Sequence, residues 1–236
     1  MPSHVDLSVV IPVYNGQPFI SDAIDSVLSQ TGFSIEVIVV DNNSTDGTRQ
    51  LVSDRYGSAV ILVVETRPSA ARARNAGCHL ASGNWLAFLD ADDIWLPRKL
   101  WRQSEEWKKQ PEIDLLFTQG QEFHSPELDE RERERLASRP EPYPLLTPSS
   151  VLMKRETFMK VGDFPEVPSG EFIAWLGWAR EMGLREFVLP EVLVRRRIHC
   201  HNSTRAGSGI AGYTLAARWL IEKRRGKEIS NGNPKL

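Results

Sequence analysis

Apolar runs alternate with helix-periodic segments over the first ninety residues. The runs are Leu7–Ile11, Glu36–Val40, Val60–Val64 and Trp85–Leu89. Short, almost continuous apolar runs are typical of strands buried on both faces, and Pro12 is predicted to end the first one. Between the first two runs, apolar residues from Ile20 recur at i, i+3, i+4, i+7 and i+8, the spacing of one helix face. This alternation predicts an α/β fold with a parallel sheet and right-handed crossovers.

The second half of the chain is less regular. Expected helices cover 50–56, 69–81 and 97–109 and begin again near Glu171, and short strands are expected at 115–118 and 186–189. Residues 124–143 are charged and lack apolar periodicity, which indicates a mobile loop or an exposed helix. We find no internal repeat and no second core, so we expect one domain.

Composition narrows the class of protein. The 236 residues are 41% hydrophobic and 25% charged, as in ordinary globular proteins. A net charge of -2 gives no overall field for nucleic acid, so we expect no nucleic-acid partner. Two isolated cysteines make no disulfide framework, no apolar run reaches about 20 residues, and the first residues lead us to expect no signal peptide. We therefore expect a cytoplasmic protein without a transmembrane segment, and peripheral membrane association stays open.

Acidic and amide residues follow the predicted strands. In parallel sheets, ligands bind beyond the carboxyl ends of the strands. Asp90 and Asp92 follow the fourth run, and strand alternation would point both carboxylates at one hard cation, Mg²⁺ or Mn²⁺. Alternatively these acids cap the next helix, which suits Asp93 well but Asp90 poorly. Trp95, just past the acids, is a candidate to stack on a ligand.

Basic residues elsewhere could hold the phosphates that complete such a metal site. Candidates are Arg72 and Arg74, and, late in the chain, the three arginines 195–197 followed by His199 and His201. Three consecutive arginines in extended chain cannot all face one way, so at most two are expected at the site. His199 is either a further metal ligand or a phosphate donor.

Six segments, in order, carry a resemblance to a known family. They are VVIPVYNG (9–16), VIVVDNNSTDGT (37–48), ARARNAG (71–77), SGNWLAFLDADD (82–93), SSVLMKRETFMKVGDF (149–164) and SGEFIAWL (169–176). With them the chain resembles family 2 glycosyltransferases, which have the GT-A fold. The resemblance spans most of residues 5–205 and is looser in the second half.

This resemblance implies an architecture and a reaction. The architecture is a single GT-A domain over 1–236, a Rossmann-like, mostly parallel sheet flanked by helices. Residues 5–115 would bind the nucleotide sugar, 116–205 would form the smaller acceptor and catalytic region, and 206–236 a tail. The reaction would move a sugar from a nucleotide-diphosphate donor to an acceptor hydroxyl, with inversion and with Mg²⁺ or Mn²⁺.

The resemblance also implies roles for individual residues. The nucleotide-binding set it implies is Pro12, Val13, Tyr14, Asn15, Asp41, Asn42, Arg74, Asp90, Ala91 and Asp92. The first four would surround the nucleoside and Asp41 would read the base. Asn42 stands where the family commonly has a second acid, so a preference for uracil is left open. Asp92 and His199 are the implied metal site, with Asp90 nearer the ribose.

Glu171 is the expected general base. Aligned on Trp175-Leu176, it takes the place of the aspartate that opens a helix in the family and deprotonates the acceptor hydroxyl. An acid in a first helical turn is also favoured by the helix dipole, and this is compatible with catalysis.

Two other functions are weighed against this one. A sugar nucleotidyltransferase would also use strand-end acids and Mg²⁺, but it usually has a glycine-rich loop after the first strand, which IPVYNGQP lacks. A nucleotide-sugar-binding pseudoenzyme is suggested by Asn42 and by the unusual Glu171. The acceptor could be a glycan, a peptide or a small molecule, and residues 124–143 and the tail are expected to help select it.

Overall fold

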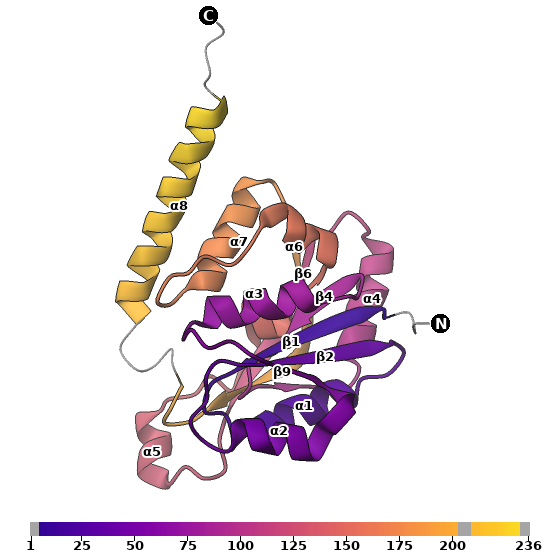
Figure 1. The fold of residues 1–236 in the computed structure, drawn as a ribbon, viewed down its shortest axis with the longest axis vertical. Helices are drawn as coiled ribbons and strands as arrows, with labels where there is room; N and C mark the ends of the chain where they lie inside the picture. The colour runs from indigo at the N-terminus through magenta and orange to yellow at the C-terminus, as the bar shows by residue number, and fades with distance from the viewer. Residues whose placement is uncertain (1–4, 203–208, 232–236) are drawn as a thin grey trace, which may run out of the picture.

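A computed structural model describes residues 5–202 and 209–231 of the chain (Figure 1). Its first half is the predicted parallel unit. The strands are β1 (Leu7–Val13), β2 (Ile35–Asp41), β3 (Ile61–Val64) and β4 (Trp85–Phe88), hydrogen-bonded in the order β3-β2-β1-β4. All three of these pairings are parallel, so the four carboxyl ends meet at one edge of the sheet.

Helices connect these strands across both faces. They are α1 (Ile20–Leu28), α2 (Thr48–Tyr56), the short 3-10 turn η1 (Gly57–Ala59) and α3 (Ala70–Leu80). Figure 1 shows α1 and α2 on one face of the sheet and α3 on the other. Ser69 caps α3 by accepting a hydrogen bond from the backbone N–H of Arg72, the usual role of serine at a helix start.

The second half extends the same sheet. Its strands are β5 (Ile94–Trp95), β6 (Leu115–His124), β7 (Tyr143–Leu145), β8 (Leu152–Lys154) and β9 (Glu186–Ile198). The described strands form one sheet in the order β3-β2-β1-β4-β8-β6-β9-β5, with β7 paired to β6. Strand β8 is antiparallel to both β4 and β6, while β6 and β9 run parallel. The sheet is therefore mixed, with its parallel half on the side of the predicted donor site.

The remaining helices are α4 (Lys99–Lys109), α5 (Glu130–Arg135), η2 (Pro148–Ser150), α6 (Arg155–Val161), α7 (Glu171–Glu181) and α8 (Gly209–Asn231). Figure 1 shows α6 and α7 on the face that α3 covers, and α8 alongside α7. One buried core lies beneath α1, α2 and α4, and a second lies beneath α3, α6 and α7. Among the described residues, no helix combines the length and apolar character needed to cross a bilayer. The cytoplasmic location stays a prediction.

Several predicted boundaries differ from the structure. Pro12 does not end β1, because it faces the β4 side beyond the last β1–β4 pair, where no ladder hydrogen bond is lost. Pro97 lies before α4, which begins at Lys99. The strands expected at 115–118 and 186–189 are the starts of β6 and β9, which stay paired with each other as far as His124 and Ile198. The extensions are rich in polar residues and pair with a strand that is distant in the chain, so no local pattern predicted them.

Residues 124–143 were expected to form either a mobile loop or an exposed helix, and they contain an exposed helix. Helix α5 opens with a capping box, in which the Asp129 carboxylate accepts from Glu132 N and the Glu132 carboxylate accepts from Asp129 N. His124 ends β6 and Tyr143 begins β7, so the segment is anchored in the sheet at both ends.

Candidate active site

The acids that follow β4 lie in a tight turn. The strand ends at Phe88, and the backbone N–H of Asp93 donates to Asp90 O at 3.0 Å. The argument that strand alternation aims Asp90 and Asp92 the same way is therefore wrong, because neither residue is in a strand. Asp90 faces α3 and Asp92 faces the end of β9, so the turn presents its acids to two different sets of partners.

Arg74 joins Asp90 to Glu171. Its Nη2 atom donates to Asp90 Oδ1 at 2.6 Å, and its Nη1 atom pairs with Glu171 Oε1. The Arg74 side chain is 7% exposed. Burial alone would lower its pKa, but the two carboxylates outweigh burial and raise the pKa above the ordinary arginine value. The structure thus brings together three of the predicted site residues around one permanent cation.

Local structure fixes Glu171 at this point. It is the first residue of α7, after Gly170, whose φ of +79° is readily adopted only by glycine. The helix is anchored by Trp175, whose Nε1 donates to Gly162 O at 2.7 Å and whose ring lies 5.3 Å from that of Phe164. Trp175 is buried, as its helical spacing suggested. The carboxylate therefore stands on a rigid support, the arrangement that a general base needs.

Asp92 is held by residues at and beyond the end of β9. His199 Nε2 lies 2.9 Å from Asp92 Oδ2, and Asn202 Nδ2 donates to the same oxygen at 3.1 Å. Asn202 also fixes the turn itself, because its Oδ1 accepts from His199 N at 2.7 Å and its Nδ2 donates to Arg197 O at 3.1 Å. The histidine and the acid predicted to share a metal are thus in direct contact.

Arg197 is the arginine of the basic run that reaches the acidic turn. Its side chain is 5% exposed, donates to Asp92 O at 3.0 Å and pairs with Asp22 of α1 at 2.6 Å. Arg195 lies on the same side of β9 as Arg197, since the guanidinium groups of both arginines lie over the ring of Phe123. Arg196 pairs instead with Glu122 at 3.1 Å. The expectation that at most two of the three arginines lie at the site is consistent with this geometry.

Asp93 supports the turn from within. Its side chain is buried and accepts from Ser149 Oγ at 2.8 Å and from Arg197 N at 3.2 Å. Burial raises the pKa of this carboxyl well above its usual range, and the neighbouring Asp92 and Asp90 raise it further. The structural role expected for Asp93 fits these contacts. Trp95, by contrast, is buried, and its Nε1 donates to Ser149 O at 2.7 Å, so the idea that it stacks on a ligand is wrong.

The predicted nucleoside site lies at the ends of β1 and β2. Tyr14 is 60% exposed, whereas Val13 is buried and Pro12 and Ala91 are partly buried. Asn15, at φ +50°, holds the loop after β2 by accepting from Thr45 N at 2.8 Å. Tyr14 is therefore the accessible aromatic surface at this edge.

Asp41, which is expected to read the base, and its neighbour Asn42 differ in how they are bonded. Asp41 is fully buried and paired through Oδ2 with Arg49 at 2.7 Å, while its Oδ1 has no hydrogen-bond partner among the described residues. Asn42 donates to Glu65 O and Arg67 O and accepts from Ser69 N, which fixes the loop before α3. Asp41 thus keeps an unused acceptor, whereas the Asn42 amide is engaged within the protein.

Three residues of this site were not found from the sequence. Asn202 donates to Asp92, and Asp22 pairs with Arg197. Ser149 donates to Asp93 and accepts from Asp90 N at 3.1 Å. Asp22 was hidden in an amphipathic helix pattern, and Asn202 in a basic stretch. Ser149 lies in a matched family segment, which was the only available signal.

The donor set around Asp92 fits a small divalent cation in part. Octahedral Mg²⁺ binds its ligands at about 2.1 Å, which separates neighbouring ligands by about 3 Å. Asp92 Oδ2 and His199 Nε2 are 2.9 Å apart. In the part of the chain that the structure describes, no cluster of three or more His, Cys, Asp or Glu side chains could hold a metal. A cation here would need ligands from a bound molecule, as diphosphates usually supply.

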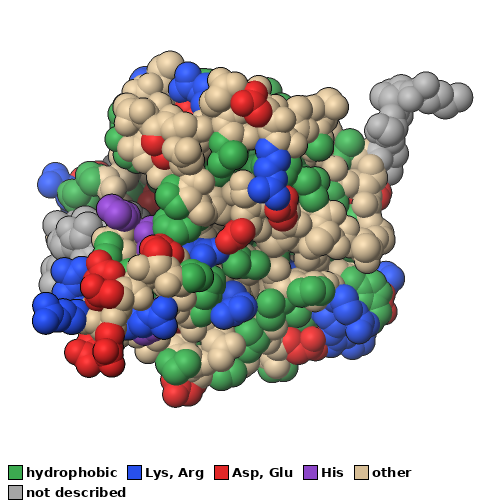
Figure 2. All heavy atoms as spheres, turned by 90° about the horizontal axis from the view of Figure 1, so that it is seen from below, with side chains coloured by type: hydrophobic (Ala, Val, Ile, Leu, Met, Phe, Trp, Pro, Cys, Tyr) green, Lys and Arg blue, Asp and Glu red, His purple; other side chains and the backbone are tan. Residues whose placement is uncertain are grey.

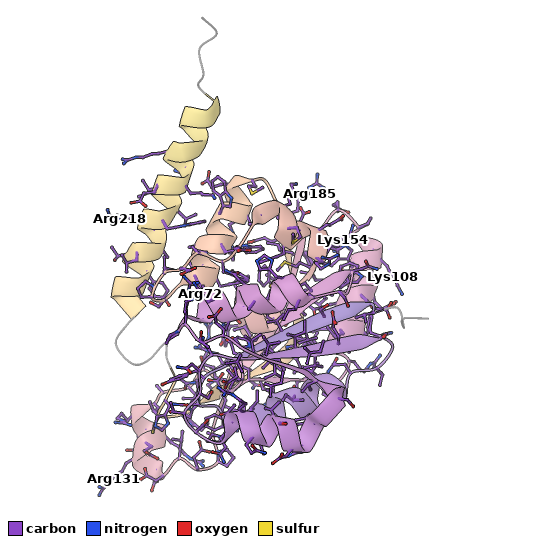
Figure 3. All side chains as sticks on the ribbon, viewed as in Figure 1. Arg72, Lys108, Arg131, Lys154, Arg185 and Arg218 are labelled. Carbon is purple, nitrogen blue, oxygen red and sulfur yellow. The ribbon has the colours of Figure 1, made fainter. Side chains whose placement is uncertain are left out.

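The surface around the site carries charge of both signs. Figure 2 shows acidic, basic and histidine side chains intermixed at the left margin of the view, and the carboxyl ends of the parallel strands lie on the same side in Figure 1. Arg72, at the start of α3 in Figure 3, belongs to this side and pairs with Glu166. Recognition of an anion here therefore depends on a few placed groups rather than on a broad positive field.

Comparisons with known proteins bear on the family and the fold. The model of glycosyl transferase family 2 matches residues 8–162. The Escherichia coli protein WfgD, a UDP-Glc:alpha-D-GlcNAc-diphosphoundecaprenol beta-1,3-glucosyltransferase, is 43% identical over 95 residues, covering 40% of this chain and 38% of WfgD. Other curated relatives are covered over 20% to 65% of their length, so the chain spans less than two thirds of each.

Two solved structures share the fold. S. aureus TarS 1–349 in complex with UDP-GlcNAc superimposes with a TM-score of 0.70 at 19% identity, over 86% of this chain and 61% of that one. The mannosyltransferase PcManGT from Pyrobaculum calidifontis, in complex with GDP-Man and Mn²⁺, gives a TM-score of 0.61 at 21% identity, over 99% and 67%. The expected GT-A fold is confirmed.

Proposed function

The chain belongs to glycosyl transferase family 2, and from this premise we propose that it transfers a sugar, with inversion, from a nucleotide-diphosphate sugar to an acceptor hydroxyl. The observation that carries the proposal is Arg74, which holds Asp90 at the donor side and Glu171 at the start of α7 around one guanidinium. A donor phosphate needs a cation and an attacking hydroxyl needs a base, and here both lie at one edge of the sheet.

The donor is proposed to enter across the ends of β1 and β2. Tyr14 offers an exposed ring to the nucleobase. Asp41 Oδ1 is an unpartnered acceptor, but it is buried, so the loop after β2 would have to move for it to reach a base N–H. The wall of this donor site is formed by Pro12, Val13, Asn15 and Ala91. Asn42 stays a predicted contact, although its amide is used by the loop. Arg74 and Asp90 would then meet the ribose and the diphosphate.

Asp92 and His199 are proposed to hold Mg²⁺ or Mn²⁺ together with the donor diphosphate. The cation, when bound, would neutralise the negative charge that develops on the departing diphosphate. Asn202 and Arg197 orient Asp92 for this role through its carboxylate and its backbone carbonyl. PcManGT, whose structure contains GDP-Man and Mn²⁺, supports this assignment by shared fold.

In the transfer step the Glu171 carboxylate takes the proton of the acceptor hydroxyl. The hydroxyl oxygen forms a bond to the anomeric carbon, and the bond from that carbon to the diphosphate oxygen breaks, leaving its electron pair on the diphosphate. Attack from the face opposite the leaving group inverts the anomeric centre. Glu171 must release Arg74 to act as a base, so donor phosphates that draw Arg74 towards themselves would free the carboxylate.

The acceptor is proposed to approach Glu171 at the start of α7. WfgD acts on a lipid-linked diphosphate sugar, and a glycan on such a carrier is the acceptor class we favour for this chain. A peptide or a free metabolite remains an alternative outcome of an acceptor screen.

A thermal-shift screen of UDP-, GDP-, dTDP- and ADP-sugars, each with and without Mn²⁺ or Mg²⁺, tests the donor site. One nucleotide class should raise the melting temperature in a metal-dependent way, because ligands that bind only the folded state stabilise it. No shift with any donor and metal would contradict the proposal. Release of pyrophosphate from a nucleoside triphosphate would favour a nucleotidyltransferase instead.

A further inference from the structure

A second concave surface lies at the amino ends of the parallel strands, at the opposite end of the sheet from Asp90. Leu7 and Trp85, paired between β1 and β4, belong to its floor, and α4 forms one wall. It encloses 440 Å³ and is lined mainly by apolar side chains, of which Phe33, Trp85, Trp101 and Trp107 are aromatic, with the charged pair Glu105–Lys108 at its rim. We call it the aromatic groove and define it by Phe33, Trp85, Trp101, Glu105, Trp107 and Lys108.

Three of the chain's seven tryptophans meet in this groove. The rings of Trp85 and Trp107 pack edge to face at 4.6 Å. Trp101 is 37% exposed, and the guanidinium of Arg98 lies 4.3 Å from its ring and limits its orientation. Trp107 Nε1 is buried without a hydrogen-bond partner among the described residues, although a buried indole N–H usually finds one.

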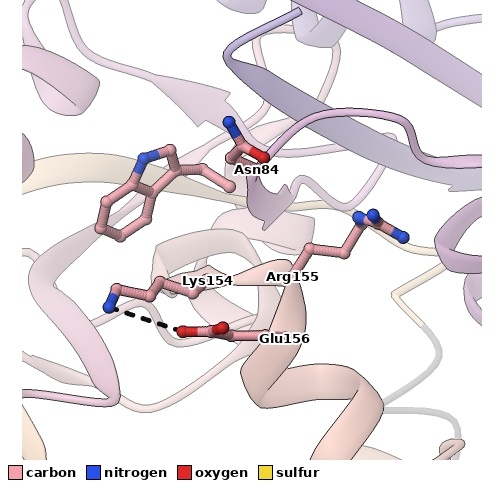
Figure 4. A pocket seen from close by; sticks show the side chains of 5 residues that line it. Asn84, Lys154, Arg155 and Glu156 are labelled. Carbon is pink, nitrogen blue, oxygen red and sulfur yellow. Dashed lines mark ion pairs between the residues drawn. The ribbon is translucent and has the colours of Figure 1, made fainter.

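A smaller polar hollow adjoins the groove on the other side of Trp85. It encloses 370 Å³ and is lined by Asn84, Lys154, Arg155 and Glu156 together with Trp85 (Figure 4). Lys154 Nζ lies 3.5 Å from Glu156, and Arg155 Nε donates to Gly83 O at 3.1 Å. In the described chain the terminal nitrogens of Arg155 have no hydrogen-bond partner, so they are available to an anion. Figure 3 shows Lys108 and Lys154 at the same end of the molecule, away from Arg72.

We propose that the aromatic groove and this hollow together bind a saccharide that carries a carboxylate. A pyranose ring has apolar C–H faces and a polar rim, which match indole rings bordered by Ser104, Glu105 and Lys108. The carboxylate lies in the hollow, where Lys154 and Arg155 exceed Glu156 by one positive charge. This site lies outside the proposed donor site and needs neither nucleotide nor metal.

The size of the groove favours a saccharide over a protein partner. Its 440 Å³ falls within the roughly 300–1,000 Å³ of small-molecule sites. A stable protein interface buries about 800 Å² and uses about 20–30 residues on each partner, whereas eleven residues line this groove.

Calorimetric titration of the metal-free and nucleotide-free protein tests the proposal with two probes, tetragalacturonate and maltotetraose. The wild type should bind the acidic probe several times more tightly than the neutral one. Trp101→Ala should weaken both about tenfold, which corresponds to about 1.4 kcal/mol. Lys154→Gln should remove the preference for the acid while leaving maltotetraose binding unchanged. Tyr213→Ala, which removes an exposed aromatic side chain from α8, is the matched control and should change nothing.

Three results would overturn the proposal. One is no binding of tetragalacturonate to the wild type at ~10 mM, a concentration that reveals even weak sites. Another is binding that Trp101→Ala leaves intact in a variant whose melting curve is normal. The last is a wild-type dimer in sedimentation that becomes a monomer in Trp101→Ala with no saccharide bound, which would make the groove a contact between copies of this chain. None of these results depends on transferase activity.

Discussion

The guanidinium of Arg74 is paired with the carboxylate of Glu171, although 97 positions of sequence separate the two residues. The same guanidinium donates to Asp90 at 2.6 Å. One buried cation therefore couples the acidic turn after β4 to the start of α7. In the proposed reaction these are the donor side and the acceptor side, so binding of a donor phosphate at Arg74 would act directly on the base.

Replacing Arg74 by alanine should damage both stability and donor binding. It leaves two carboxylates without their shared cation, and removing one partner of a buried ion pair typically costs about 3 kcal/mol or more. Urea unfolding measures the stability, and the metal-dependent thermal shift measures donor binding. The control is Arg72→Ala, because the Arg72–Glu166 pair is more exposed and should contribute less than about 1 kcal/mol. Equal losses in both variants would remove the special role of Arg74.

Asn202→Ala should weaken binding of the donor with Mn²⁺ while leaving most of the fold intact. The variant loses the N–H that holds Asp92 Oδ2 and the acceptor that fixes His199 N, so the predicted metal ligands lose their shared orientation. We expect a loss of about tenfold or more, the effect usual for residues that orient metal ligands. Titration calorimetry provides the value, with Asn84→Ala at the far end of the sheet as the control. Unchanged affinity in Asn202→Ala would count against this assignment.

Lys99 provides a pH test that is independent of the active site. Its ammonium is buried, lies 4.0 Å from the Trp95 ring and donates to Gln103 at 2.8 Å, and burial lowers its pKa well below the ordinary value. Between the lowered pKa and the unfolded value of about 10.4, the unfolded chain binds a proton that the folded chain does not. Folding stability should therefore rise with pH across that window.

Lys99→Met should remove this contribution. Urea unfolding of both proteins from neutral to alkaline pH should show a stability difference that moves in favour of the wild type as pH rises. Because every other titrating group is common to both chains, parallel curves would mean that Lys99 stays charged in the folded protein.

Gly77→Ala tests how closely α3 packs on the sheet that positions Arg74. A Cβ at Gly77 would collide with the Val10 side chain of β1, and such overpacking costs about 1–3 kcal/mol. Gly226→Ala in α8 is the matched control, since a Cβ there meets nothing within 4 Å and alanine favours the helix by up to about 1 kcal/mol. Thermal unfolding should move in opposite directions for the two variants, and a neutral Gly77→Ala would contradict the packing.

The parallel half of the fold was readable from the sequence because its signals are local. Continuous apolar runs predict β1 to β4, and the residues after them lie at one edge because parallel strands share a direction. Pro12 shows the limit of this reasoning. A proline ends a strand only where its missing N–H faces a neighbour, and which side it faces depends on where β4 ends.

The rest of the site depends on distant partners that no local pattern encodes. The extension of β9 through Arg197 follows from its ladder with β6, and Asn202 reaches Asp92 across 110 positions. The pairing of Arg74 with Glu171 joins two helices on one face of the sheet, and Glu171 was identified only by resemblance to a family. Trp95 was misjudged because its sequence position beside the acids says nothing about which way its ring faces.

Turnover of the donor by Glu171→Gln tests the central claim most directly. The variant keeps the size of the side chain and removes its ability to accept a proton, so donor affinity with Mn²⁺ should remain within about threefold of wild type. Release of nucleoside diphosphate, as the sugar passes to water or to an acceptor, should fall by a factor of about 10² or more. Wild-type turnover in a variant that binds the donor normally would contradict the assignment of Glu171 as the base.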